Sequence, residues 1–534
     1  MADVTIAVHT QRAQARTIVL ALFALAFAFG IAGIFVRAHG YAGRLLWTDE
    51  AITAMRVSGQ QGAQFIAAAV DGRPHSVEEI RRFAGIGAPA PMGEVVRSLA
   101  VEDSQHPPLY YVVTGAWTRA FGFSIATLRA PALLFGILVP FAVGWMCFEL
   151  YSTRAAAALG FALASVSPVL VLYSQEAREY GLWALFVAVA TAAVLRAVRK
   201  DDARWWIVYG ACCIAGMYAD VLFATVLLSH GIYVALRVRG RPRVRFVLCL
   251  AAAALAFAPW AVEILKHQRA IDLSNAWTAG PWPLRMLLEK WAFNIGTTFF
   301  DLEYAKPSLA LVLVPIAALI AAAVWWNSAV LRGAARTMIV ALLAVPVVTL
   351  MLPDLVLQSH RSSVTRYEMA LWIALLVAVA GFLASRLRRK TGTGLWLSVT
   401  GALLIVMSLS SAIGANSRVW WDNRQDAPNI AIAHVLSENP SSVLVVPGRW
   451  ARLLALSFYL APSVSVEMLP PHAAAARPAG FGSAYLLGRE AEARAAHGRL
   501  ARVAFPDTGG LNAQVRSFRG GADTDELMLW RFEP

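Results

Sequence analysis

A series of long apolar runs constrains this chain more than any other feature of its sequence. A helix that crosses about 30 Å of hydrocarbon needs roughly 20 apolar residues. Runs of suitable length lie near residues 17–36, 130–149, 155–173, 180–197, 204–219, 221–236, 246–262, 308–326, 337–353, 367–385 and 394–412. Only 15% of the residues are charged, against roughly 25% in a soluble domain. The sequence therefore predicts a polytopic α-helical membrane protein of about 11 spans.

The basic residues between these runs predict the orientation, because cytoplasmic loops carry an excess of Lys and Arg. Six basic groups all reach the cytoplasm only if one further apolar segment, 107–121, does not cross. That segment opens with Pro107-Pro108, and we place it as a juxtamembrane helix or a re-entrant segment. The six groups are Arg12 and Arg16; Arg154; Arg196, Arg199, Lys200 and Arg204; Arg237, Arg239, Arg241, Arg243 and Arg245; Arg332 and Arg336; and Arg386, Arg388, Arg389 and Lys390.

The same rule accounts for the net charge of +14, so we expect no nucleic-acid partner. The first run has a basic flank like a signal peptide, but it is long for one and Arg37 follows at once. We expect an uncleaved first span. The Ala- and Arg-rich composition suggests the inner membrane of a bacterium, with membrane lipids as neighbours.

Three long segments then lie outside the cytoplasm: residues 38–129, residues 263–307, and everything from about 415. The last contains short β-like runs at 442–447, 484–487 and 527–530, with helix-like, Arg-rich stretches between them. We predict a membrane domain over 1–414, whose first outer loop is 38–129 and carries juxtamembrane helices. A small extracytoplasmic α/β domain is predicted over 415–534.

Ionisable residues gather at the outer ends of the predicted spans. Asp49 and Glu50 form an acidic pair in the first outer loop. Two carboxylates at an apolar boundary are costly unless they meet a cation, a metal or a reacting hydroxyl group. The alternative is that Thr48 or Asp49 caps a helix beginning near Ala51. The two roles can coexist.

Three further groups could face a ligand. His106 is held on extended backbone by the prolines that follow it, and Tyr110 comes shortly after; a lone loop histidine is usually structural. Arg178 could bind a lipid phosphate, or could form a salt bridge with Glu176 or Glu179. Outward-facing basic residues at 360–366 run against the charge rule, and an anionic ligand would explain them. We assign Asp220 to a tight turn between two predicted spans.

Taken in order, these residues resemble the C-type membrane glycosyltransferases, and more closely the family-39-like group that includes protein O-mannosyltransferases and the aminoarabinose transferase of lipid A. The resemblance covers roughly residues 15–385. Its motifs are Trp47-Thr48-Asp49-Glu50-Ala51, His106-Pro107-Pro108-Leu109-Tyr110-Tyr111, Phe121-Gly122 with Leu128-Arg129-Ala130-Pro131, and Tyr173-Ser174-Gln175-Glu176-Ala177-Arg178-Glu179-Tyr180.

The resemblance implies an inverting transfer of a sugar from a polyprenyl phosphate to an extracytoplasmic glycan, lipid or protein. Asp49 would be the catalytic base, and Glu50 would support it or touch a metal. His106 would lie beside the donor phosphate, with Arg178 and Arg366 as weaker phosphate contacts. The expected substrate-pocket residues are Tyr110, Gln175, Tyr180, His360 and Tyr367. No cofactor is implied with certainty, and a divalent cation stays open because metal use varies among these enzymes.

Two other functions are compatible with a polytopic chain. A lipid or solute transporter is disfavoured because the spans are almost free of ionisable residues, His230 being the clearest exception. A non-catalytic membrane scaffold would use the outer domain to recognise a partner, and its acidic pair would only cap a helix.

The predicted topology can be tested with one cysteine. We expect Phe123→Cys to react with a membrane-impermeant maleimide added to intact cells, because residue 123 follows the segment that does not cross. The unchanged chain measures the background from its own four cysteines. Labelling only after the membrane is opened would reverse the assignment of every loop.

Overall fold

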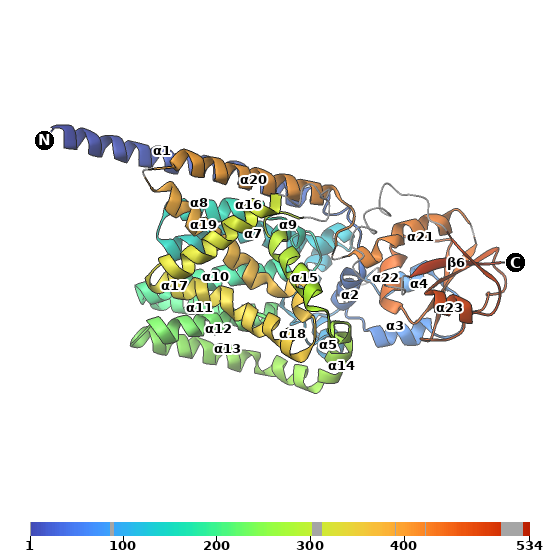
Figure 1. Cartoon of the computed structure of the whole chain (residues 1–534). Helices are drawn as coiled ribbons and strands as arrows, with labels where there is room; N and C mark the ends of the chain where they lie inside the picture. The colour runs from blue at the N-terminus through green and yellow to red at the C-terminus, as the bar shows by residue number, and fades with distance from the viewer. Residues whose placement is uncertain are drawn as a thin grey trace. The chain divides into compact units, whose positions relative to one another are not determined.

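The computed structural model describes residues 2–85, 90–301, 312–389, 391–421, 423–439, 441–503 and 527–533. The chain forms two compact units, each assembled from separate stretches of sequence (Figure 1). The membrane unit comprises Met1–Tyr41, Asp103–Tyr110 and Arg129–Asn416. The sheet unit comprises Ala42–Glu102, Tyr111–Leu128 and Ser417–Pro534.

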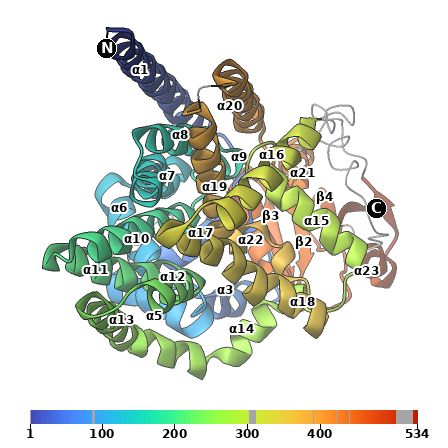
Figure 2. The same ribbon diagram turned by 60° about the vertical axis from the view of Figure 1, so that its left-hand side comes forward.

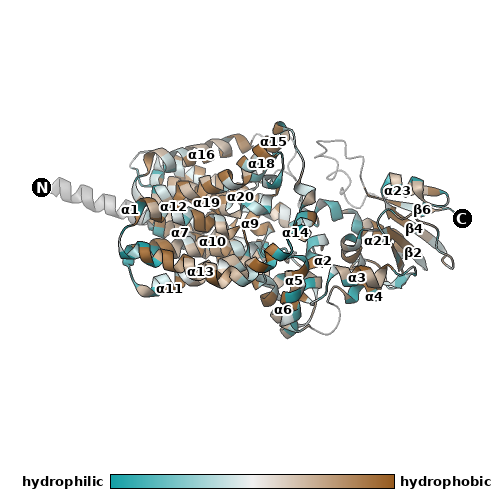
Figure 3. Cartoon of the chain, turned by 90° about the horizontal axis from the view of Figure 1, so that it is seen from below, coloured by the Kyte–Doolittle hydropathy of each residue, from teal (hydrophilic) through white to brown (hydrophobic). Residues whose placement is uncertain are grey.

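The membrane unit is a bundle of helices that run side by side (Figure 1). Apolar residues dominate the sequence of these helices (Figure 3). The helices are α1 (Ala2–Ala38), α7 (Ile125–Tyr151), α8 (Arg154–Ser165), α9 (Pro168–Leu172), α10 (Tyr180–Lys200), α11 (Ala203–Ala219), α12 (Phe223–Arg237), α13 (Arg241–Lys266), α14 (Gln268–Ser274), α15 (Leu284–Thr297), α16 (Leu313–Trp325), α17 (Gly333–Pro346), α18 (Leu352–Leu357), α19 (Met369–Leu387) and α20 (Thr393–Asn416).

Within the described residues, the predicted apolar runs coincide with helical structure; residues 308–311 of the run 308–326 lie outside them. Among the described residues, eight helices are long and apolar enough to cross a membrane. They are Val19–Ala38, Ile125–Tyr151, Tyr180–Lys200, Arg241–Lys266, Leu313–Val330, Gly333–Leu357, Thr365–Leu387 and Thr393–Asn416. Arg154–Ser165 and Phe223–Arg237 are shorter apolar helices. A multi-pass membrane protein is confirmed, while the number of eleven spans stays a prediction.

Helix α19 forms the core of the bundle. It packs against α8, α10, α16, α17 and α20, and its residues from Met369 to Ala384 are almost all buried. Figure 2 shows α19 with α8, α16, α17 and α20 around it. A Cβ atom at Gly381 would lie 2.2 Å from the Tyr151 ring. Only glycine allows α7 and α19 to approach this closely.

The predicted run 155–173 is divided between α8 and α9. Pro168 begins α9 and has no N–H to donate, so carbonyl groups at the end of α8 need other donors. Buried Arg37, on α1, supplies them: its guanidinium donates to Ala164 O at 2.9 Å and to Ser165 O. A break in the helix is tolerated because the freed carbonyl groups are bonded inside the protein.

The sheet unit contains a six-stranded sheet in the order β1-β3-β2-β4-β6-β5. Strand β2 is central and parallel to β3 and β4, and the β1–β3, β4–β6 and β5–β6 pairs are antiparallel. All six residues of β2 are buried, as expected for a strand covered on both faces. The strands are β1 (His75–Ser76), β2 (Ser442–Pro447), β3 (Ser465–Leu469), β4 (Ser483–Gly488), β5 (Leu500–Arg502) and β6 (Met528–Phe532). The three predicted β-like runs are therefore strands.

The helices of the sheet unit come from both ends of the chain. They are α2 (Thr48–Val57), α3 (Gly62–Ala69), α4 (Val77–Arg82), α5 (Met92–Glu102), most of α6 (Leu109–Phe121), α21 (Pro428–Ser437), α22 (Trp450–Ser457) and α23 (Glu490–Ala495). Helix α6 has 13 residues and rises only about 20 Å, too little for a span of about 30 Å. This length agrees with the expectation that 107–121 does not cross.

The compact units depart from the domain boundaries proposed at residues 414 and 415. Most of the first outer loop packs with the chain after 416, because its backbone and side chains bond there. His75 and Ser76 pair with Val466 and Ser465 at the edge of the sheet. Arg81 Nε donates to Ser457 O at 2.7 Å. The sheet unit is therefore built from three stretches of sequence rather than from 415–534 alone.

Candidate functional site

The acidic pair lies in the first turn of α2, in the sheet unit. Trp47 is the N-cap residue, and no side chain of the helix caps it. Instead, Asp426 accepts hydrogen bonds from Thr48 N at 2.9 Å and from Thr48 Oγ1 at 3.0 Å. The alternative in which Thr48 or Asp49 caps this helix is therefore wrong. The cap is a carboxylate 378 residues away in the sequence.

Asp426 is itself held by a cation. Arg452 Nε lies 3.1 Å from Asp426 Oδ1, and the Asp426 side chain is fully buried. Burial raises the pKa of Asp426 above its ordinary value, although Arg452 and Thr48 act in the opposite direction. The two acids of the predicted pair, which follow Thr48 in the same helix, differ in their exposure to solvent. Glu50 is fully buried, whereas Asp49 is half-buried. Of the pair, only Asp49 is open to solvent.

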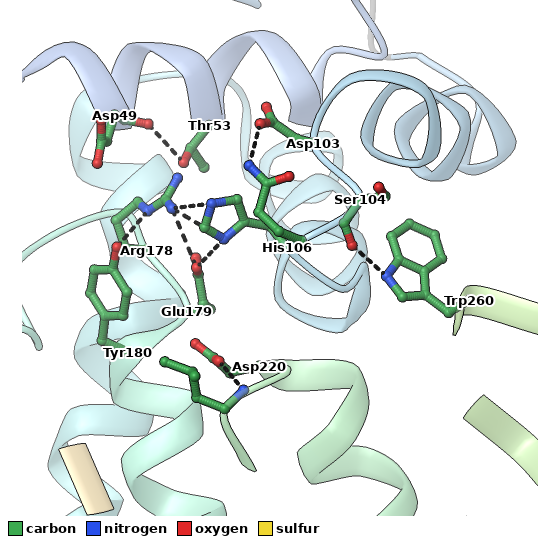
Figure 4. Close-up of polar contacts among 12 residues, drawn as sticks. Asp49, Thr53, Asp103, Ser104, His106, Arg178, Glu179, Tyr180, Asp220 and Trp260 are labelled. Atoms are coloured by element: carbon green, nitrogen blue, oxygen red, sulfur yellow. Dashed lines mark hydrogen bonds and ion pairs between the residues drawn. The ribbon is translucent and has the colours of Figure 1, made fainter. Parts of the chain in front are cut away.

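In the membrane unit, His106, Arg178 and Glu179 form a cluster (Figure 4). His106 Nδ1 lies 2.7 Å from Glu179 Oε1, and Arg178 Nη2 lies 3.3 Å from the same oxygen. Arg178 Nε donates to Tyr180 Oη at 3.3 Å. The Glu179 and Arg178 side chains are 1% and 4% exposed, whereas that of His106 is 26% exposed. The histidine is thus the open side of the cluster.

Local backbone structure brings these residues together. His106 N donates to Asp103 O at 2.8 Å, which closes a turn immediately before Pro107 and the start of α6. Trp260, on α13, donates to Ser104 O at 2.9 Å and holds the same turn. Arg178 and Glu179 lie between α9 and α10, and Glu179 is the N-cap residue of α10.

Within the cluster, Glu179 keeps a negative charge although its side chain is buried. Burial alone would raise the pKa of Glu179, but Arg178 and His106 lower it to about 2. Glu179 is therefore a carboxylate, and it holds two nitrogen-bearing side chains side by side: Arg178 Nη2 lies 3.3 Å from His106 Nε2. A planar guanidinium beside an imidazole is a donor set that suits phosphate oxygens.

Asp220 lies between α11 and α12 and closes a turn, as predicted. Its Oδ1 accepts a hydrogen bond from Leu222 N at 2.8 Å. Burial, with the nearby charge of Glu179 as the next cause, raises the pKa of Asp220 to about 7. The sequence did not reveal this proximity to Glu179, because the two residues belong to different turns.

The predicted residues after 359 form a separate aromatic group. His360 is buried and stacks on Trp282, with ring centroids 4.3 Å apart and an interplanar angle of 10°. The guanidinium carbon of Arg366 lies 5.9 Å from the Trp277 ring and 5.8 Å from that of Tyr367. Such cation–π contacts orient Arg366 without removing its charge.

The other predicted pocket residues are buried. Tyr110 is fully buried, and Tyr180 packs edge-on against Tyr173. Gln175 Nε2 donates to Arg37 O at 2.9 Å and to His39 O at 3.1 Å, so this amide holds the end of α1. Their contact with a substrate stays a prediction. No group of three His, Cys, Asp or Glu side chains that could hold a metal ion occurs within the described residues.

Comparison with known proteins gives a family match over part of the chain. Residues 105–264 match the family described as dolichyl-phosphate-mannose-protein mannosyltransferase. This segment contains His106, Arg178, Glu179 and Asp220. No curated protein sequence matches the chain.

The fold is similar to that of ArnT from Cupriavidus metallidurans in the apo state, with a TM-score of 0.54 and 13% identity over 95% of this chain and 97% of that one. The chain has the C-type glycosyltransferase fold. The predicted fold class is thereby confirmed. The same protein bound to undecaprenyl phosphate gives a TM-score of 0.53, with the same identity and the same coverage of both chains.

The archaeal oligosaccharyltransferase of Archaeoglobus fulgidus in its apo form gives a TM-score of 0.46 at 10% identity. That alignment covers 84% of this chain and 64% of the archaeal one. The chain therefore spans about 64% of the length of the archaeal protein.

The raised pKa of Asp220 predicts a pH-dependent stability. The carboxyl group titrates near 3.8 when unfolded and about 7 when folded. Between these values the folded chain holds the extra proton, so stability falls as the pH rises. Asp220→Asn keeps an acceptor for Leu222 N and removes this proton. We expect its thermal midpoint relative to wild type to rise between pH 4 and pH 8.

Thermal unfolding of the purified protein at pH 4, 6 and 8 measures this difference. The matched control is Asp272→Asn, whose side chain is exposed on α14. The same pH-dependent gain in both variants would show that burial of Asp220 is not its cause.

Proposed function

We propose that this chain transfers a sugar from a polyprenyl phosphate to an acceptor outside the cytoplasm, with inversion at the anomeric carbon. One observation carries the proposal. The buried carboxylate of Glu179 holds His106 and Arg178 as a phosphate-binding pair, within the segment that matches a family of dolichyl-phosphate-mannose-dependent transferases. The solved structure of ArnT with undecaprenyl phosphate supports a polyprenyl-phosphate donor for this fold.

The chemistry needs one base and a stabilised leaving group. The acceptor hydroxyl or amine attacks C1 of the sugar and gives its proton to Asp49. The bond between C1 and the phosphate oxygen breaks, and the polyprenyl phosphate leaves as an anion. Because that anion is already stable, no general acid is required. Asp49 is the member of the acidic pair that is open to solvent, and buried Glu50 supports Asp49 or touches a metal.

We assign the contacts with the donor phosphate to three side chains. His106 and Arg178 bind the phosphate oxygens as negative charge develops on the leaving group. Arg366, oriented by Trp277 and Tyr367, is a second cation for the same group. The donor reaches the site from the outer leaflet of the inner membrane. The acceptor is a glycan, a lipid or a protein.

The role of Asp49 predicts a loss of turnover without a loss of fold. Asp49→Asn keeps the size of the side chain but cannot accept a proton, so we expect sugar transfer to fall by about 10²–10⁴-fold. Transfer is measured with purified protein, a radiolabelled polyprenyl-phosphate sugar and membrane extract as acceptor. Glu94→Gln, an exposed acid in the same loop, is the control. Retained activity in Asp49→Asn would exclude it as the base.

The role of His106 predicts an effect on the donor. His106→Ala should raise the KM for the polyprenyl-phosphate sugar by about tenfold or more, with little change in the KM for the acceptor. A charged hydrogen bond to phosphate is worth roughly 1.5–3 kcal/mol. His39→Ala, an exposed histidine bonded to Asn416, is the control. An equal rise in both KM values would count against the phosphate contact.

A further inference from the structure

The sheet unit contains a concave site lined by residues between Gln60 and Phe83. A pocket of about 310 Å³ lies between α3, α4 and the segment that leads into β1. Its walls include Gln60, His75, Glu79, Arg82 and Phe83. The volume is at the lower end of the roughly 300–1,000 Å³ typical of small-molecule sites. It would hold one or two sugar rings rather than a lipid chain.

The back of the pocket is a fixed, buried histidine. His75 is 5% exposed, and its Nε2 lies 2.9 Å from Asp71 Oδ1. Its Nδ1 lies 3.6 Å from Glu79 Oε2. Glu79 Oε2 also accepts a hydrogen bond from Ser76 N at 2.9 Å, in the capping box of α4. The polar groups of this wall are therefore held in place before any ligand binds.

The remaining polar groups are available for a ligand. Among the described residues, the Gln60 amide, the Arg82 guanidinium and Glu79 Oε1 make no hydrogen bond or ion pair. They offer donors and acceptors together. Buried Ala69 and Ile80 and half-buried Phe83 supply an apolar surface beside them.

The combination of polar groups and apolar surface indicates which class of ligand fits the pocket. A sugar ring carries hydroxyl groups on its rim, which both donate and accept, and C–H groups on its faces, which pack on apolar surface. Arg73 also lines the pocket, but its guanidinium is paired with Asp71 at 2.7 Å. A phosphate or another anion would therefore meet Arg82 together with the carboxylate of Glu79. A lipid tail would leave Gln60, Glu79 and Arg82 unpaired, at a cost in free energy.

We propose that this pocket binds a saccharide, and that it is a subsite for the acceptor glycan. The second part rests on the proposed function, because only a glycosyltransferase has an acceptor. The first part does not, since saccharide binding is measured without turnover. Of the three acceptor classes left open above, the pocket therefore selects the glycan.

The test measures binding of a panel of hexose and N-acetylhexosamine methyl glycosides by saturation-transfer difference NMR. The full chain is placed in lipid nanodiscs, because maltoside detergents carry sugars themselves. Three variants address the pocket: Gln60→Ala and Arg82→Ala remove polar partners, and Ala68→Trp fills the pocket from an exposed position. Arg97→Ala, an exposed arginine in the same unit, is the control.

We expect at least one glycoside to bind wild type and Arg97→Ala equally, and to bind each pocket variant about tenfold more weakly or worse. No binding of any glycoside to wild type would overturn the proposal, as would equal binding to all variants. Inorganic phosphate that binds wild type and is lost in Arg82→Ala, without any glycoside binding, would assign the pocket to an anion instead.

Transfer assays separate the two proposals. Pocket variants that lose glycoside binding while Asp49→Asn and wild type show equal transfer would leave the saccharide site standing and reject the proposed catalytic base. Transfer that depends on Asp49 but is unchanged in Ala68→Trp would reject the acceptor subsite alone.

Discussion

The contacts of the buried Glu179 carboxylate are the interaction on which the cluster of His106, Arg178 and Glu179 depends. A carboxylate that is 1% exposed is stable only because Arg178 and His106 compensate for its lost hydration. The compensation works in both directions, since the same carboxylate holds the Arg178 guanidinium and the His106 imidazole beside each other. One buried negative charge thus fixes the positions of two nitrogen-bearing side chains.

A similar constraint governs the backbone at the outer end of α1. Inside a bilayer or a packed bundle, each free carbonyl group must find a donor. Arg37 serves the broken end of α8, and Gln175 serves the end of α1. Arg37 thus ties α1 to the end of α8, and Gln175 ties the turn that leads to Arg178 to the end of α1. The backbone that precedes Arg178 is therefore fixed by neighbours outside the cluster.

Much of the fold and part of the site could be predicted from the sequence, because both depend on local patterns. Apolar length predicted the helices, short β-like runs predicted β2, β4 and β6, and an ion pair of Arg178 with Glu176 or Glu179 was one of the two alternatives for that motif. The cap on α2 could not be predicted, since Asp426 carries no local signal that connects it to Thr48. Gln175 was expected to face a substrate. Its contact with a substrate stays a prediction, but the bonds from its amide nitrogen to carbonyl groups on α1 join distant segments, and no periodicity encodes them.

The edge strand β1 has a consequence for biogenesis. Ribosomes make His75 and Ser76 early, but Val466 and Ser465, their partners on β3, emerge only after every helix of the bundle has been synthesised. Between these two moments the first outer segment has no sheet to join. Maturation of the sheet unit is therefore a late event, because this edge of its sheet cannot form until β3 has been synthesised, after the helices of the membrane unit.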